Sequence, residues 1–387
     1  MASKPFSPFI IRNNSQTYDP TTHAVFSLLG RKSPIKGDIG LEVEVEGNMF
    51  PKTSEFDEDP DESDLIPHQW FYTHDGSLRG EDNAEYVLRN PLFFKDVPKA
   101  LDDLWKMFDD YGSVLDESNR TSVHVHLNAQ AWHLNRLAAF AGLYFSVEEI
   151  LTAWCGDNRV GNLFCLRAKD APAIVGKLRQ FLKTGDFGVF DEGLHYAAFN
   201  AHSLNDKGSV EIRTMRGVNN PEVIKVWVEV LQRIYELSGD YPDPRGVCEG
   251  FSGYGHESFL KNILGQHTDR ILLECGMTPS EVRASVHEGI RIAQNICYCR
   301  DWSKFKADET KPDPFGRPVK QLQSYTAEPV FIEDKVIEVP SAPQSQAYSL
   351  SLLDEALSAA IAPVNHPCAV GWVTFTQEYL DEHGNQI

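Results

Sequence analysis

Short segments in which hydrophobic and charged residues alternate one by one constrain the fold of this chain most. The clearest are GLEVEVE at 40–46, SVHVHLN at 122–128 and SVEIRT at 209–214. Because successive side chains of a β-strand point to opposite faces of a sheet, each segment predicts a strand with one apolar and one charged face. The apolar faces predict packing against helices. The opposite faces carry carboxylates, imidazoles and a guanidinium.

A fourth alternating segment, AEYVLR at 84–89, adds Glu85 to the charged face. Each pattern by itself is ambiguous, since glutamate at every second position is typical of a solvated strand. His-x-His fits a polar strand face and a metal site equally well. Together, the four segments favour one metal-binding surface, because carboxylates with one or two imidazoles suit Mg²⁺ or Mn²⁺ when phosphate oxygens complete the coordination shell.

The remaining hydrophobic patterns predict helices and two further strands. The helices are expected at about 92–111, 132–154, 171–184, 220–237 and 278–299, and the strands at 69–75 and 195–203. Asn-Asp-Lys-Gly at 205–208 predicts the turn that joins the last of these strands to the strand at 209–216. The predicted fold class is α+β, with a curved, mostly antiparallel sheet and helices packed on one face.

Composition divides the chain into three parts. Residues 1–37, rich in Pro, Ser and Asn, predict an irregular N-terminal arm. Residues 38–300, with the charged segments between 38 and 217, predict one folded domain. Residues 301–387 predict a C-terminal extension that contains a Pro-rich segment.

Charge and cysteine content exclude several classes of protein. With 36 basic and 56 acidic residues, the net charge is −20, which repels nucleic-acid backbones and argues against bulk nucleic-acid binding. Seven cysteines without a CxxC pair argue against a disulfide framework and a structural zinc site, and Cys297 and Cys299 are expected in the core. Without a signal-peptide core or an apolar stretch long enough to span a bilayer, we expect a cytoplasmic protein with no membrane partner.

The sequence contains neither a P-loop nor the Rossmann glycine fingerprint. Any nucleotide must therefore be held mainly through its metal-bound phosphates. Arg213 and Arg216, next to the predicted metal-binding face, suit the neutralisation of phosphate or carboxylate.

Several segments match known motifs in the same order along the chain. They are Gly40-Leu-Glu42-Val-Glu44, His74-Asp-Gly-Ser77 with Ala84-Glu85-Tyr-Val-Leu, Ser122-Val-His124-Val-His126-Leu-Asn128, Asp157-Asn-Arg159 with Asn162-Leu-Phe-Cys165, and Tyr196-Ala-Ala-Phe-Asn200 with Val210-Glu211-Ile-Arg213. The set resembles the amidoligases, carboxylate–amine ligases of the glutamine synthetase and glutamate–cysteine ligase type, in their bacterial and phage branch. It departs from their pattern where Thr121-Ser122 replaces a glycine. The acidic insertion at 51–68 and the residues after about 240 have no counterpart and are expected to determine substrate choice.

The resemblance implies a glutamine synthetase-like fold and an ATP-dependent reaction that forms an amide or peptide-like bond through an acyl phosphate. It implies ATP and Mg²⁺ or Mn²⁺ as cofactors, in the cytoplasm of a bacterial or infected host cell. The implied metal ligands are Glu42, Glu44, Glu85, His124 and Glu211. The implied catalytic residues are Glu85, Glu211 and Arg213, and the implied ATP or substrate contacts are Asp75, Ser77, Arg159, Asn200, Arg213 and Arg216. His126 is expected to support a ligand, and Glu85 or Glu46 to accept the proton of the amine.

Three other functional hypotheses remain open. A phosphotransferase on the same fold needs the same metals but makes no amide. A cupin-type metalloenzyme is expected to carry a glutamate shortly after His-x-His, whereas Asn128-Ala-Gln-Ala131 follows here. A non-catalytic binding or virion protein predicts lost ligands. The sequence leaves open the oligomeric state and whether the carboxylate and amine substrates are small molecules, peptides or proteins.

Overall fold

In a computed structural model of the chain, the structure describes residues 23–52, 66–76, 78, 83–116, 118–190 and 196–302. All of them lie in the first of the two units into which the chain divides, Met1–Ala327. Most of the predicted C-terminal extension, from residue 303 onward, lies outside these residues. The predicted domain boundaries therefore stay a prediction.

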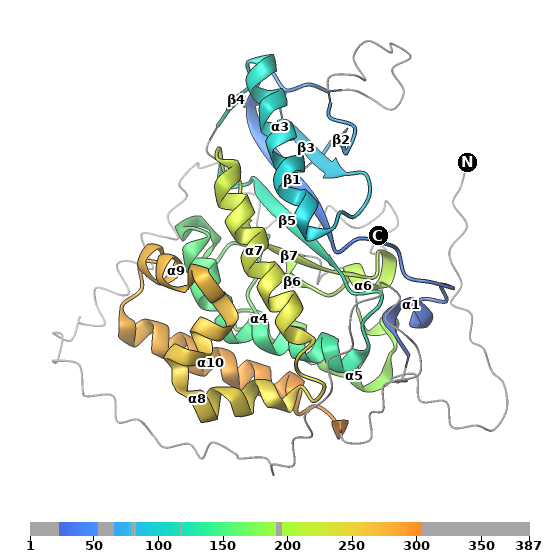
Figure 1. Cartoon of the computed structure of the whole chain (residues 1–387), viewed down its shortest axis with the longest axis vertical. Helices are drawn as coiled ribbons and strands as arrows, with labels where there is room; N and C mark the ends of the chain where they lie inside the picture. Colours follow the sequence, from blue (N-terminus) through green and yellow to red (C-terminus); the bar gives the residue numbers. More distant parts are fainter. Residues whose placement is uncertain are drawn as a thin grey trace, which may run out of the picture. The chain divides into compact units, whose positions relative to one another are not determined.

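One antiparallel sheet organises the described part of the chain (Figure 1). Its strands are β1 (Ile39–Asn48), β2 (Trp70–Thr73), β3 (Asn83–Leu88), β4 (Val114–Leu115), β5 (Ser122–Asn128), β6 (Phe199–Asn200) and β7 (Ser209–Arg216). Their order is β2-β3-β1-β5-β7-β6, with β4 paired to the far end of β1. All the paired strands are antiparallel, so the predicted α+β class and its mostly antiparallel sheet are confirmed.

Helices make up most of the remaining described chain. They are α1 (Val25–Leu28), α3 (Val97–Tyr111), α4 (Leu134–Trp154), α5 (Pro172–Thr184), α6 (Ser203–Asp206), α7 (Pro221–Ser238), α8 (Arg245–Leu264), α9 (Thr268–Glu274) and α10 (Pro279–Cys297). Local capping explains where some begin. Asn220 accepts a hydrogen bond from the Glu222 amide ahead of α7, and Thr278 and Glu281 form a capping box at the start of α10.

The hydrophobic core lies between the apolar face of the sheet and helices α3, α4 and α7 (Figure 1). Val43, Val123 and Ile212, which alternate with charged residues in the sequence, are buried there. Burying a side chain of this size contributes roughly 1.5–3 kcal/mol. This burial sets which face of each strand is inward, and it leaves the charged side chains on the opposite face.

Helix α4 is apolar on all sides and packs against α10, α7 and α8. By length and composition it is the one helix in the described residues that could cross a membrane, so the prediction that no stretch is long and apolar enough was wrong. In the structure, 89% of its most apolar window is buried inside the protein, which is also typical of a core helix. The close approach of α10 depends on Gly289, where an added Cβ would lie 2.4 Å from the Phe145 carbonyl oxygen.

Two parts of the predicted secondary structure were wrong or missing. The strand expected at 195–203 is reduced to β6, because the Asn200 side chain accepts a hydrogen bond from the His202 amide and the chain then turns into α6. Helices α8 and α9 were not predicted. Helix α8 contains four glycines, Gly246, Gly250, Gly253 and Gly255, which lower helix propensity, and its helical geometry breaks at Gly255.

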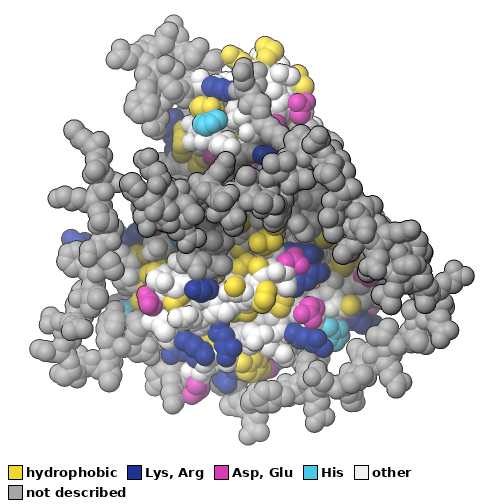
Figure 2. All heavy atoms as spheres, turned by 180° about the vertical axis from the view of Figure 1, so that it is seen from behind, with side chains coloured by type: hydrophobic (Ala, Val, Ile, Leu, Met, Phe, Trp, Pro, Cys, Tyr) yellow, Lys and Arg dark blue, Asp and Glu magenta, His cyan; other side chains and the backbone are white. Residues whose placement is uncertain are grey.

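The six cysteines in the described residues are all buried and free: Cys155, Cys165, Cys248, Cys275, Cys297 and Cys299. The assignment of Cys297 and Cys299 to the core is therefore confirmed. On the molecular face shown in Figure 2, acidic, basic and hydrophobic side chains are interspersed among the residues drawn in colour. The large negative net charge does not form a continuous acidic field among them.

Candidate active site

Strand register places the predicted metal ligands opposite one another on the charged face of the sheet. The directly opposed pairs are Glu44–Glu85 between β1 and β3, Glu42–His124 between β1 and β5, and His126–Glu211 between β5 and β7. Directly opposed residues of an antiparallel pair share a face, with neighbouring Cβ atoms. The structure therefore brings all five predicted ligands together, and it adds His126 to them.

These side chains form three groups in which one ligand atom from each residue lies within 4.8 Å of the others. The groups are Glu44, Asp75 and Glu85; Glu42, Glu85 and His124; and Glu42, His126 and Glu211. Because Glu85 and Glu42 each belong to two groups, the three groups make one continuous line, which we call the charged row. Asp75, predicted as an ATP or substrate contact, and His126, predicted as a support, both lie among the ligands.

The acidic end of the charged row consists of Glu44, Asp75 and Glu85. Burial, together with the charges of Glu42 and Glu44, raises the pKa of Glu85 to about 8. Burial also raises the pKa of Glu44, whose Oε2 accepts hydrogen bonds from the amide and hydroxyl of Ser122 at 2.8 and 2.7 Å. Among the described residues, no lysine or arginine forms an ion pair with Glu44 or Glu85. The His124 imidazole, whose Nε2 lies 3.5 Å from Glu44 Oε1, and the charge of Arg213 favour the ionised form of Glu44, but burial outweighs them.

Glu42 lies in the middle of the row between the two imidazoles. Its Oε2 is 3.1 Å from His124 Nδ1, and its Oε1 is 2.9 Å from His126 Nε2. Burial alone would raise the pKa of Glu42, but the charge of His126 and the hydrogen bonds to both histidines hold that pKa well below its usual range. Burial and the charge of Arg213 lower the pKa of His124. The surrounding carboxylates raise it by more, so the pKa of His124 lies above its ordinary value.

The opposite end of the row, around Glu211, is charge-compensated. Oε1 of Glu211 accepts a hydrogen bond from Arg213 Nη1, and Oε2 accepts from Asn200 Nδ2 at 2.7 Å and Ser203 Oγ at 2.8 Å. Burial would raise the pKa of Glu211, but the charges of His126 and Arg213 outweigh it and lower the pKa to about 2. Both carboxylate oxygens of Glu211 therefore have strong donors, unlike Glu85.

A bulge in β7 puts two arginines on the charged face. Val125 of β5 pairs with Ile212, whereas Val123 pairs with Met215, so β7 carries one extra residue between these pairs. Strict alternation from Arg213 would place Arg216 on the apolar face. With the extra residue, Arg216 instead pairs with Ser122 on the charged face. Its Nη1 donates a hydrogen bond to the Cys155 carbonyl.

The side chain of Arg159 stabilises this bulge through hydrogen bonds to its backbone. The side chain is only 1% exposed. Its Nε donates to the Thr214 carbonyl at 3.0 Å and its Nη2 donates to the Arg213 carbonyl at 2.6 Å. The structure thus places Arg159, which was predicted as an ATP or substrate contact, against the backbone that carries Arg213.

Other predicted residues have varied positions. Asn200 donates to Glu211, and Glu46 lies on β1 opposite Asn83. Ser77 lies outside the described residues. Sequence reasoning missed Lys207, whose Nζ lies 3.0 Å from Glu42 Oε1. The only available signal was its position in the predicted turn at 205–208, directly before a charged strand.

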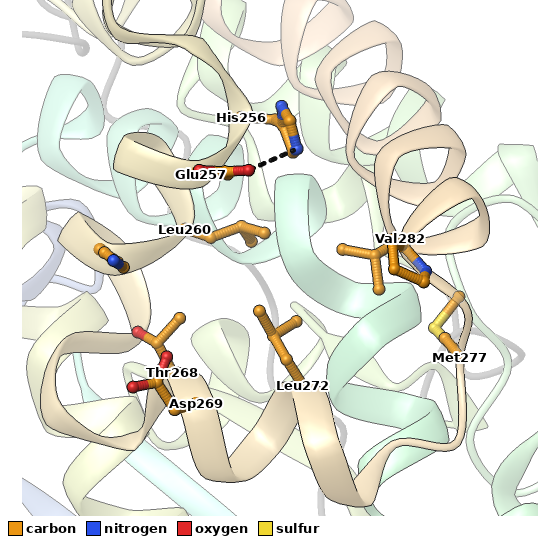
Figure 3. A pocket seen from close by; sticks show the side chains of 10 residues that line it. His256, Glu257, Leu260, Thr268, Asp269, Leu272, Met277 and Val282 are labelled. Atoms are coloured by element: carbon orange, nitrogen blue, oxygen red, sulfur yellow. Dashed lines mark ion pairs between the residues drawn. The ribbon is translucent and has the colours of Figure 1, made fainter.

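A separate pocket of about 300 Å³ lies among α8, α9 and α10 (Figure 3). Leu260, Leu272 and Val282 contribute apolar lining, and His256 and Glu257, 3.9 Å apart, line it as well. None of its lining residues belongs to the charged row. The pocket lies in the region after residue 240, for which the role in substrate choice stays a prediction.

Comparison with protein families identifies the class of the chain. A family model described as "Putative amidoligase enzyme" matches residues 54–235. This match supports the assignment to the amidoligases that the motifs predicted. No match was found among curated proteins. The matched segment includes Asp75, Glu85, His124, Glu211 and Arg213. It does not include β1, so Glu42 and Glu44 are assigned to the site because β1 pairs with β3 and β5.

Proposed function

We propose that this amidoligase is an ATP- and Mg²⁺- or Mn²⁺-dependent carboxylate–amine ligase with a glutamine synthetase-like fold. The observation that carries the proposal is the charged row, three overlapping groups of carboxylates and imidazoles on one sheet face next to Arg213. The donor set is oxygen-rich with two imidazoles, which fits Mg²⁺ or Mn²⁺. Lys207, whose ammonium contacts Glu42, is a second sign that the row accommodates a cation.

Glu42, Glu44, Glu85, His124 and Glu211, joined by Asp75 and His126, would hold the divalent ions. The ions would neutralise the phosphates of ATP and polarise the γ-phosphoryl group. Arg213 lies within reach of the same region through its Nη1, which contacts Glu211 and lies 3.4 Å from His124 Nδ1. Its fixed guanidinium suits the negative charge that develops on the transferring phosphoryl group.

The proposed reaction has two steps. An oxygen of the substrate carboxylate bonds to the γ-phosphorus of ATP as the bond to the β-phosphate oxygen breaks, which gives an acyl phosphate and ADP. The amine nitrogen then bonds to the acyl carbon, and phosphate leaves. Glu85, whose pKa is raised to about 8 by burial and its acidic neighbours, suits the removal of the amine proton near neutral pH when it is not a ligand, and Glu46 is the alternative acceptor.

A phosphotransferase on the same fold would use the same charged row, and family membership favours the ligase. A non-catalytic binding or virion protein is disfavoured because the five expected ligands remain and lie together. A cytoplasmic location, and a carboxylate and an amine substrate that are small molecules, peptides or proteins, belong to the same proposal.

The test starts from the protein, ATP, Mg²⁺ and pooled carboxylates and amines, with mass spectrometry to find an amide product. The carboxylate substrate is then labelled with ¹⁸O. One labelled oxygen is expected in the released phosphate, because the acyl phosphate passes that oxygen to phosphorus. Unlabelled phosphate together with a confirmed amide would exclude the acyl-phosphate route. ADP formation with a phosphorylated substrate as the product, and without amine-dependent phosphate release, would instead favour the phosphotransferase.

A further inference from the structure

Lys207 reaches the charged row from its edge. It follows α6 in the turn that leads into β7, and its side chain is 57% exposed. Its Nζ nevertheless lies 3.0 Å from Glu42 Oε1 and 3.5 Å from His126 Nε2. Glu42 and His126 are two of the three residues in the Glu42–His126–Glu211 group. The ammonium of Lys207 therefore contacts the same ligand atoms that a divalent ion in this group would use.

The backbone of Lys207 is fixed although its side chain is exposed. Its carbonyl accepts hydrogen bonds from Gln130 Nε2 at 2.8 Å and Arg31 Nη1 at 3.4 Å. Gly208 follows with φ +69°, a left-handed conformation that favours glycine, and a Cβ added there would lie 2.5 Å from Gln130 Cγ. The turn therefore holds the Cα of Lys207 beside the row, and rotation of the side chain decides whether the ammonium lies in the group or outside it.

Charge balance distinguishes this group from the acidic end. Here two carboxylates, Glu42 and Glu211, are matched by two cations, Lys207 and Arg213. A divalent ion would add two positive charges beside carboxylates that Lys207 and Arg213 already neutralise, and at these distances its repulsion of the ammonium is strong. At the acidic end, neither Glu44 nor Glu85 forms an ion pair with a lysine or arginine among the described residues. An ion entering the Glu42–His126–Glu211 group must therefore displace Lys207 first.

We propose that Lys207 is a built-in competitor for divalent ions at the Glu42–His126–Glu211 group. Its ammonium occupies the group while the other two groups bind metal, and the third ion binds only when the side chain of Lys207 swings out. The inference rests on the proposed function, because it assumes that divalent ions bind the charged row. In this role, Lys207 controls how many divalent ions the charged row holds.

The experiment is a Mn²⁺ titration of the full chain, with free Mn²⁺ measured by electron paramagnetic resonance. Lys207→Met removes the charge but keeps a similar length, and Lys207→Arg is the matched control that keeps the charge. Lys207→Met is expected to bind one more Mn²⁺ per chain than the wild type, or to bind the weakest ion at least about tenfold more tightly. Lys207→Arg should follow the wild type. Adding His126→Gln to Lys207→Met should remove the gain, which assigns the extra ion to this group.

The outcomes separate this inference from the proposed function. Equal Mn²⁺ stoichiometry and affinity in the wild type and Lys207→Met would overturn the role of Lys207 and leave the metal-binding row intact. A gain that survives His126→Gln would overturn the assignment to this group. If neither protein binds Mn²⁺, the proposed metal-dependent function fails and the inference fails with it. Thermal melting of each variant checks that it is folded, as expected for an exposed lysine.

Discussion

At the acidic end of the charged row, Glu44, Asp75 and Glu85 are crowded together, and burial and neighbouring charges raise the pKa of Glu85 to about 8. At the compensated end, Glu211 accepts hydrogen bonds from Arg213, Asn200 and Ser203, and its pKa falls to about 2. Both ends are built from carboxylates on the same sheet face. The difference is in their partners: Glu211 forms an ion pair with Arg213, whereas neither Glu44 nor Glu85 forms one with a lysine or arginine in the described part of the chain.

The largest expected effect comes from removing a ligand at the acidic end. Glu44→Ala should lower ATP turnover by about a hundredfold to a thousandfold, because it removes a buried carboxylate from a group that would hold a metal ion. Steady-state ADP release at saturating Mg²⁺ measures this. Glu257→Ala, which changes an exposed carboxylate outside the row, is the matched control and should turn over ATP normally. Normal turnover by Glu44→Ala would show that the acidic end is not a metal site.

The next effect tests the fixed cation of the compensated end. Arg213→Ala should slow phosphoryl transfer by about a hundredfold, because it removes one positioned donor from the transition state. Arg213→Lys should recover only part of the rate, since lysine lacks the planar fork that pairs with Glu211. Single-turnover measurements of ADP formation separate this step from product release. Full activity in Arg213→Ala would show that Arg213 does not take part in phosphoryl transfer.

The two ends should respond oppositely when their carboxylates are neutralised in metal-free protein. Glu211→Gln should lower the free energy of unfolding by about 3 kcal/mol, because it leaves the buried Arg213 guanidinium without its ion-pair partner. Glu85→Gln should keep or raise that free energy, because it removes a carboxylate crowded by other carboxylates. Urea unfolding in the presence of a chelator measures both. A loss of stability in Glu85→Gln as large as in Glu211→Gln would contradict the difference between the ends.

The smallest effect, taken per pH unit, is the pH dependence of stability. Glu85 has a folded pKa of about 8 against an ordinary 4.5, so the folded state binds its proton more tightly and stability falls as pH rises through this interval. Glu211 has a folded pKa of about 2, so its contribution is present above pH 4.5 and is lost as pH falls towards 2. Each slope approaches about 1.4 kcal/mol per pH unit for one proton. In urea unfolding of metal-free protein, Glu85→Gln should reduce only the first slope and Glu211→Gln only the second. Part of the first slope should remain in Glu85→Gln, because burial also raises the pKa of Glu148 to about 8.

Period-two alternation in 40–46, 122–128 and 209–214 was enough to predict the charged face and its opposed apolar face. This works because the direction of a side chain in a strand depends only on the position of its residue along the strand. The helices with regular hydrophobic spacing or clear caps, such as α3 and α10, were predictable for the same local reason. Glycine-rich α8 was not, since packing against α4, α7 and α10 stabilises it despite its low helix propensity.

Only the tertiary structure decided which charged residues meet. Strand order brings Glu85 next to Glu44 and Glu211 next to His126, and neither pairing can be read from one strand alone. The bulge that keeps Arg216 on the charged face also depends on pairing, because alternation by itself assigns that residue to the other face. Lys207 reaches Glu42 across 165 positions of sequence. Pattern along the chain therefore determined the chemistry of the face, and long-range hydrogen bonding between strands determined which charges neutralise one another.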